Sequence, residues 1–315
     1  MNVLVVLLLA IATAACDNVT FYSYSAPEKP ASTAAAPPQA PTASLPQINA
    51  DRAMQYTREV TDLGPRPIGS EAHTKLQAYI RAHLKGVTVE EDVFTAQTAA
   101  GPFPLRNIIA KFPGTKDGII VIAGHYDTIL TLKGFVGAND GGSSTGLPLE
   151  LAEQFKGRKL DGYSVWIVWF DGEEATKSWS DTDSLYGSKH LAQKWAQDGT
   201  LKKIKAFLLL DMIGDKDLNI EREQNSTPWL QDVVYAAATK LGYQSYFYGR
   251  SEPIDDDHLP FAKRGVPVVD LIDLNYGPNN SYHHTLQDTI DKVSPKSLQI
   301  VGDTVLETVQ MLNQQ

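Results

Sequence analysis

Short apolar runs alternate with amphipathic segments along most of the chain. Runs such as Ile-Ile-Val-Ile-Ala within residues 118–124 are typical of strands buried on both faces. They predict strands at 87–94, 105–112, 118–124, 163–170, 207–210 and 266–272. Helical periodicity predicts helices at 49–62, 70–85, 143–156, 184–198, 227–241 and 294–312, the last with Ser294 as N-cap and Pro295 at its first position. This alternation predicts a single α/β domain with a mostly parallel, twisted central sheet and helices on both faces.

The pattern differs at the N-terminus. Residues 3–15 form an almost unbroken apolar run with the length of a signal-peptide core. Small residues precede Cys16, as in a bacterial lipobox, so we expect 1–16 to be a signal peptide with a lipidated cysteine; a plain cleaved signal peptide is the alternative. Residues 17–47 are rich in Pro and Ala and predict a disordered tether, and 48–315 form the folded domain. We therefore expect an exported protein, anchored to a membrane only by lipid in the periplasm or at the cell surface, or otherwise secreted.

Composition adds few constraints. The 315 residues are 43% hydrophobic and 21% charged, which is ordinary for a globular protein with a buried core. The net charge is −9 and no basic stripe is visible, so we do not expect nucleic acid as a partner. Cys16 is the only cysteine, which excludes an intramolecular disulfide. We expect a monomer.

Charged side chains follow the predicted strands at the point where each strand ends. These are His125 and Asp127, then Asp171, Glu173 and Glu174, and then Asp211. The last predicted strand, 266–272, leads on to His283 and His284, and Asp140 lies in a Gly-rich loop between the first two groups. Ligand sites of open α/β sheets lie at the carboxyl ends of the strands, so we expect these groups to converge. Each one alone could be an ordinary cap or a solvated loop residue, but these four strands and the loop with Asp140 together favour a site.

Carboxylates brought together in a dry site repel each other, and a divalent cation relieves that repulsion. Histidine nitrogen with Asp and Glu oxygen suits zinc. Glu173 and Glu174 are adjacent and cannot point the same way from an extended segment. One of them can therefore bind the metal while the other acts as a general acid/base, provided that burial raises its pKa toward neutrality.

The chain resembles the glutaminyl cyclases and, more broadly, the zinc aminopeptidases of the same fold, over residues 50 to 312. His-Tyr-Asp at 125–127, Gly-Ala-Asn-Asp at 137–140, Asp-Gly-Glu-Glu-Ala at 171–175, Leu-Leu-Asp at 209–211 and His284 match the whole group. The segments 183–191, 256–261 and 264–268, together with Trp179, are similar to the cyclases specifically.

The resemblance implies a role for each matching residue. It implies one zinc ion held by Asp140, Glu174 and His284, with Glu173 as acid/base, Asp211 and Asp256 as hydrogen-bonded catalytic carboxylates, and Trp179 as a wall of the substrate pocket. His125 and Asp211 match residues that hold a second zinc ion in the aminopeptidases, and Asp127 would orient His125. Animal cyclases carry Trp immediately before the zinc histidine, where this chain has His283. The shape of the pocket and the preferred substrate can therefore differ.

Three functions are considered, and the similarity of Trp179 and of the segments 183–191 and 256–261 to the cyclases favours the first. The first is a zinc-dependent cyclotransferase that converts N-terminal Gln of peptides or proteins to pyroglutamate with release of ammonia, with one zinc ion. The second is an aminopeptidase with two zinc ions that share Asp140. The third is a binding protein on the same fold that has lost catalysis. The residues themselves do not decide between one metal ion and two.

Other patterns are not assigned to the site. The sequence of residues 142–146 matches Gly-x-Ser-x-Gly, but a loop precedes it where a nucleophile elbow needs a strand. We expect His258 to support the pocket without contacting a metal. His190 lies on a predicted helix, and we expect it to be structural.

Overall fold

The computed structural model describes residues 47–314. The predictions for the signal segment 1–16, for Cys16 and for nearly all of the tether 17–47 lie outside the described residues. Within 47–314, none of the helices has both the length and the apolar character needed to cross a membrane.

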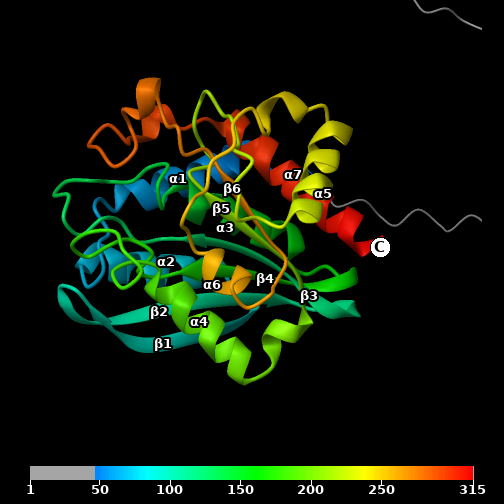
Figure 1. Ribbon diagram of the computed structural model, residues 1–315, viewed down its shortest axis with the longest axis horizontal. Coiled ribbons are helices and arrows are strands. Elements are labelled where there is room, and N and C mark those ends of the chain that lie inside the picture. Colours follow the sequence, from blue (N-terminus) through cyan, green and yellow to red (C-terminus); the bar gives the residue numbers. More distant parts are fainter. Residues whose placement is uncertain (1–46, 315) are drawn as a thin grey trace, which may run out of the picture. The chain divides into compact units, whose positions relative to one another are not determined.

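A six-stranded mixed sheet forms the centre of the fold (Figure 1). The strands are β1 (Thr88–Thr98), β2 (Gly101–Phe112), β3 (Gly114–His125), β4 (Leu160–Phe170), β5 (Ile204–Asp211) and β6 (Val268–Ile272), in the order β1-β2-β4-β3-β5-β6. β4, β3, β5 and β6 pair in parallel, whereas β1 pairs with β2 and β2 pairs with β4 antiparallel. All six predicted strands are present, and the predicted α/β class is confirmed.

β1 and β2 are longer than the sequence predicts. They form a hairpin whose register runs without interruption from Thr98 opposite Gly101 to Thr88 opposite Lys111. The added residues are mostly polar or exposed, so no apolar pattern marks them. Each strand is extended by hydrogen bonds to its partner, so the hairpin is longer than the alternation of hydrophobic and polar residues predicts.

Helices cover both faces of the sheet. α1 (Ala50–Asp62), α2 (Glu71–His83), α3 (Ser143–Phe155), α5 (Pro228–Lys240) and α7 (Pro295–Asn313) share the larger hydrophobic core with one face. α4 (Tyr186–Gln197) and the short α6 (Leu259–Ala262) pack on the other face (Figure 1). Short 3-10 turns are Thr200–Lys203, Gln244–Tyr246, Pro278–Asn280 and Ile290–Lys292. The predicted cap of the last helix is confirmed, because the Ser294 hydroxyl accepts a hydrogen bond from the Lys296 amide.

The central strands are buried on both faces, which explains their continuous apolar sequences. Along β3, Ile120 and Ile122 belong to the larger core, while Val121 and Ala123 belong to the opposite one. The parallel register sets His125 at the end of β3 opposite Phe170 at the end of β4. The side chains that follow these two strands are therefore held at one edge of the sheet.

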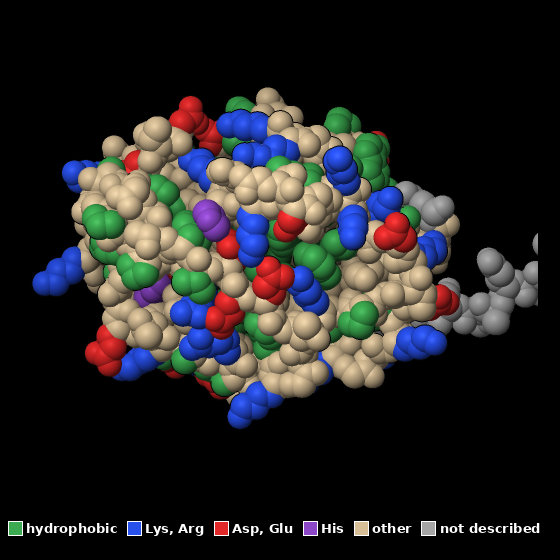
Figure 2. Space-filling view, turned by 90° about the horizontal axis from the view of Figure 1, so that it is seen from below, with side chains coloured by type: hydrophobic (Ala, Val, Ile, Leu, Met, Phe, Trp, Pro, Cys, Tyr) green, Lys and Arg blue, Asp and Glu red, His purple; other side chains and the backbone are tan. Residues whose placement is uncertain are grey.

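The exterior shows no single-sign patch on the face seen in Figure 2. Lys and Arg side chains alternate there with Asp, Glu and hydrophobic side chains. This face therefore offers no extended basic stripe of the kind that binds a phosphate backbone.

Candidate metal centre and active site

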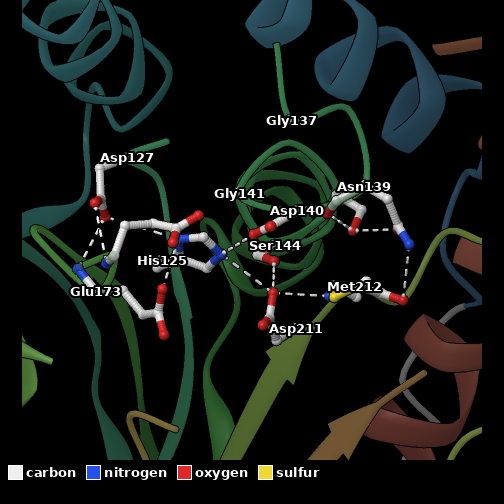
Figure 3. Close-up of polar contacts among 12 residues, drawn as sticks. His125, Asp127, Gly137, Asn139, Asp140, Gly141, Ser144, Glu173, Asp211 and Met212 are labelled. Carbon is white, nitrogen blue, oxygen red and sulfur yellow. Dashed lines mark hydrogen bonds and ion pairs between the residues drawn. The ribbon is translucent and has the colours of Figure 1, made fainter. Parts of the chain in front are cut away.

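His125 lies at the end of β3 and is surrounded by carboxylates (Figure 3). Its Nε2 atom is 3.1 Å from Asp140 Oδ1 and 3.2 Å from Asp211 Oδ1. Its Nδ1 atom is 3.7 Å from Asp127 and 3.9 Å from Glu173. Burial by itself lowers the pKa of His125, but the negative charges of the neighbouring carboxylates, Asp211 first among them, outweigh it and raise this pKa well above the usual value. The predicted convergence of these residues is thus present in the structure.

Asp140 is presented by the Gly-rich loop that leads into α3. Gly137 takes φ +48°, and a Cβ atom there would lie 2.2 Å from the Asp140 carbonyl oxygen, so a larger residue would displace the loop. The two oxygens of Asp288 accept hydrogen bonds from the amides of Asn139 (2.8 Å) and Asp140 (3.0 Å). The backbone at Asp140 is therefore fixed by a carboxylate that lies far away in the sequence.

Arg66 and Asp288 support this loop and were not predicted from the sequence. Arg66 is fully buried and donates to the carbonyl oxygens of Val136 (2.6 Å) and Gly137 (3.0 Å). Burial lowers its pKa to about 10, which still leaves it charged at neutral pH. Arg66 lies between two prolines, and that context is typical of an exposed turn. Only the tertiary fold shows that this cation is internal.

Asp127 contacts the backbone of the Glu pair. Its Oδ1 atom accepts from the Glu173 amide at 3.0 Å and its Oδ2 atom accepts from the Glu174 amide at 3.3 Å. These contacts are shorter than its 3.7 Å approach to His125. Asp127 therefore fixes the turn in which two adjacent glutamates point in different directions.

His284 forms the other half of the candidate metal centre. Its Nε2 atom is 3.3 Å from Asp140 Oδ2 and 3.8 Å from Glu174 Oε2. Its backbone is left-handed, with φ +51°, which is uncommon for a residue other than glycine and often marks a functional site. The rings of His283 and His284 lie 4.0 Å apart, and the side chain of Asn280 is 3.3 Å from His283 Nδ1.

The residues present fit a divalent cation. Asp140 Oδ2, Glu174 Oε1 and His125 Nδ1 are buried without any hydrogen-bond partner, and leaving such atoms unpaired is costly unless an ion satisfies them. Two groups of candidate ligand atoms each lie within 4.8 Å of one another. They are His125, Asp140 and Asp211 in one group and Asp140, His283 and His284 in the other. Asp140 belongs to both groups, so it could bridge two ions or serve one.

The carboxyl groups around this centre are too crowded to be ionised together. Burial raises the pKa of Glu173 well above the usual range, and the charges of Glu174, Asp256 and Asp257 raise it further, although His125 lowers it. Burial likewise raises the pKa of Glu174 and of Asp256, and it raises that of Asp257 to about 7. A cation held at this place would relieve the repulsion, as the sequence predicts.

One cavity joins these groups. The predicted site residues that line it are Asp140, Glu173, Trp179, Asp211, Asp256, His283 and His284. His125, Asp127 and Glu174 are buried and are not among its lining residues. Ile254, Ile272 and Leu274 add apolar surface, and the Trp179 side chain is 41% exposed at the edge. The cavity therefore combines an apolar wall with convergent carboxyl and imidazole groups, as small-molecule sites usually do.

His258 is fully buried beside this cavity. Its Nε2 atom is 3.2 Å from Glu223 and its Nδ1 atom is 3.6 Å from Asp270. Glu223 also accepts a hydrogen bond from the Ile254 amide at 3.0 Å. Glu223 thus holds both ends of the turn that carries Asp256, and His258 is in neither group of candidate ligand atoms.

His190 lies away from this centre. Its ring stacks on Phe94 at 3.9 Å and its Nδ1 atom is 2.8 Å from Asp92. These contacts join α4 to β1.

Comparison with known proteins agrees with the geometry. The family model described as Peptidase family M28 matches residues 107–309. A glutaminyl-peptide cyclotransferase of Drosophila melanogaster is 30% identical, over 78% of this chain and 78% of its own length. The crystal structure of an Acidobacteriales bacterium glutaminyl cyclase is 51% identical with a TM-score of 0.85, covering 90% of this chain and 99% of that one. A Porphyromonas gingivalis glutaminyl cyclase is 30% identical with a TM-score of 0.75, covering 84% and 98%. The chain therefore belongs to peptidase family M28 and, within it, to the group that contains the glutaminyl-peptide cyclotransferases.

Proposed function

We propose that the protein converts the N-terminal glutamine of peptides to pyroglutamate and releases ammonia, with a zinc ion held by Asp140, Glu174 and His284. The observation that carries this proposal is the cavity in which the buried carboxyl groups of Glu173 and Asp256 adjoin the candidate ligands. The relatives also support the proposal, because the three proteins compared above are named glutaminyl-peptide cyclotransferase or glutaminyl cyclase.

The chemistry that zinc supplies in such a site is Lewis-acid polarisation of a carbonyl group. Glu173 takes a proton from the α-amine of the substrate glutamine, and the amine nitrogen then forms a bond to Cδ, the carbonyl carbon of the side-chain amide of that glutamine. Glu173 returns the proton to the side-chain amide nitrogen, the bond between this nitrogen and Cδ breaks, and ammonia leaves. Because the attack is intramolecular, the protein mainly contributes orientation and charge stabilisation.

The environment of Glu173 suits this exchange. A carboxyl group with an ordinary pKa would be a poor acid at neutral pH, and burial corrects this by raising the pKa of Glu173. We assign Asp256 and Asp211 to positioning the reacting groups. Asp211 Oδ1 is fixed by the Ser144 hydroxyl and the Met212 amide, both at 2.8 Å.

Hydrolysis of N-terminal residues is the second candidate function. The observation that favours it is the group of His125, Asp140 and Asp211, which could hold a second ion. Two ions that share Asp140 would suit activation of a water molecule, a step that cyclisation does not need.

Removal and restoration of metal test the proposal. Protein treated with a strong chelator is expected to lose ammonia release from a Gln-Ala peptide and to regain it with about one equivalent of zinc per chain. Elemental analysis on the same samples gives the metal content. Full activity in protein shown to be free of metal would contradict the proposal.

We also propose that the protein is exported, carries a lipid on Cys16 and acts as a monomer. Residues 17–47 would then form the tether that connects the lipidated cysteine to the catalytic domain, residues 48–315. Cys16→Ser is expected to release the protein from membranes into the soluble fraction. The same distribution for both forms would contradict lipidation.

Asp183 anchors the loop that presents Trp179 to the cavity. Its carboxylate accepts from the amides of Thr176 (2.9 Å), Lys177 (2.8 Å) and Ser178 (3.0 Å). Burial raises its pKa, but hydrogen bonds from Thr176 and Tyr186 outweigh this and lower the pKa well below the usual value. The anchoring group is therefore a carboxylate at neutral pH.

Asp183→Asn replaces one acceptor oxygen with a donor and loosens this loop. We expect KM for Gln-peptides to rise roughly tenfold, with a smaller change in kcat. The control is Asp161→Asn, which changes an exposed residue near the start of β4, at the other end of this strand from the site. An unchanged KM in Asp183→Asn would show that the position of Trp179 does not depend on this carboxylate.

A further inference from the structure

A second cavity adjoins the first one. Trp179 and Asp255 line both cavities. The second cavity lies between α6 and the segment of the chain that leads into α4, and its apolar lining includes Leu185, Leu259 and Pro260. It has no part in the mechanism above, although only a shared wall separates it from the reacting groups.

Three cations line the second cavity, namely Lys189, Lys263 and Arg264. The Lys189 ammonium group donates to the carbonyl oxygens of Asp181 (2.7 Å) and Ser184 (2.8 Å), which fixes its position without neutralising its charge. Arg264 donates to the Pro260 carbonyl oxygen at 2.7 Å. None of the three forms a salt bridge with another residue of the described part of the chain.

Two acidic side chains, Asp181 and Asp255, also line this cavity. Both are exposed, as are Lys263 and Arg264, so solvent screens the charges of these four residues. Lys189 is half-buried by contrast. Burial is the main reason why its pKa lies below the usual value, and the charge of Lys263 also lowers it, while the charges of Asp181, Asp257 and Glu173 act in the opposite direction. The ammonium group therefore lies within electrostatic range of both Lys263 and the catalytic Glu173.

The substrate must extend out of the first cavity. Its reacting residue is at its N-terminus, so the residues that follow glutamine lead away from Glu173 and past the edge of the cavity. An extended peptide advances about 3.3 Å per residue, which brings the second to fourth residues over a neighbouring cavity. Trp179 and Asp255 form the edge that the second cavity shares.

We propose that the second cavity is a subsite for the peptide that follows the N-terminal glutamine, and that it favours a glutamate side chain there. This inference rests on the proposed function and adds the substrate class to it. The carboxylate would face Lys189, Lys263 and Arg264, and the methylene groups of the side chain would contact Leu259 and Pro260. Glutamate suits the site better than aspartate because its longer stem covers more of the apolar surface.

Matched peptides test the subsite. Cyclisation of Gln-Ala-Glu-Ala and Gln-Glu-Ala-Ala would be compared with that of peptides in which the neutral isostere Gln replaces Glu, at low and high salt. At low salt we expect kcat/KM to be roughly three- to tenfold higher for at least one of the two Glu peptides than for its Gln counterpart, because its KM is lower. Screening by salt is expected to reduce the difference.

The double substitution K263Q/R264Q identifies the cations responsible. We expect it to lower kcat/KM for the acidic peptides more than for the neutral ones and so to remove most of the preference. The control K202Q/K203Q removes the same charge from exposed residues of the turn before β5 and is expected to keep the preference. The subsite is wrong if neutral and acidic peptides are cyclised equally well by the unmodified protein, or if K263Q/R264Q keeps the full preference. If no Gln-peptide is cyclised at all, the proposed function itself fails, and the subsite fails with it.

Discussion

Glu173→Gln is expected to lower kcat for cyclisation by about 10²–10⁴-fold while the protein stays folded and keeps its metal. The glutamine side chain has nearly the same shape, but it cannot take a proton from the substrate amine or return one to the leaving nitrogen. Glu173 lines the cavity, whereas the neighbouring Glu174 does not and lies 3.8 Å from His284. The measurement is ammonia release under saturating substrate, with zinc content determined on the same sample.

Glu174→Gln is the matched control for this experiment, because it makes the same change one residue away. We expect it to lose metal as well as activity. The pair would then separate proton transfer from metal binding. Substantial activity in Glu173→Gln, or equal loss of zinc in both variants, would contradict the role assigned to Glu173.

His284→Ala is expected to remove the metal and to lower activity on the order of a thousandfold. The loss follows from geometry, because the His284 Nε2 atom lies between the carboxylates of Asp140 (3.3 Å) and Glu174 (3.8 Å). Zinc added to the unmodified protein should also raise its melting temperature, since the ion binds only the folded state, and this stabilisation should be absent in the variant. Elemental analysis and thermal unfolding give the two readings.

Two further variants make this result specific. His283→Ala alters the adjacent ring, which is expected to form part of the substrate pocket, so zinc should remain bound. His125→Ala should also keep one zinc ion per chain if the protein works with a single metal. A second ion in the unmodified protein that disappears in His125→Ala would instead favour the aminopeptidase arrangement. Retention of full zinc content by His284→Ala would contradict the ligand set.

The strands that position the site could be predicted from the sequence. The apolar run in β3 and the charged residues that follow it predicted both the strand and the position of His125, because buried parallel strands and ligand positions at their carboxyl ends have clear patterns. The turn with Glu173 and Glu174 was predicted for the same reason. The polar extensions of β1 and β2 were not, because pairing with a partner strand leaves no pattern in either strand alone.

The buried residues that hold the loop with Asp140 in place could not be predicted in this way. Asp288 holds the amides of Asn139 and Asp140 although about 150 residues separate them, a contact that only the fold determines. Arg66 appears in the sequence as a turn cation and is fully buried in the structure. Local sequence indicates what a side chain can do, but the partners of a buried charge are set by tertiary packing.

The most direct test of the proposed function is the identity of the product from one Gln-peptide. The purified protein, loaded with zinc, would be incubated with Gln-Ala-Ala-Phe, and the products would be separated and identified by mass spectrometry. The proposed function predicts a peptide of unchanged length that has lost one molecule of ammonia and carries N-terminal pyroglutamate. Free glutamine together with Ala-Ala-Phe, without any pyroglutamyl peptide, would contradict it and would identify the protein as an aminopeptidase.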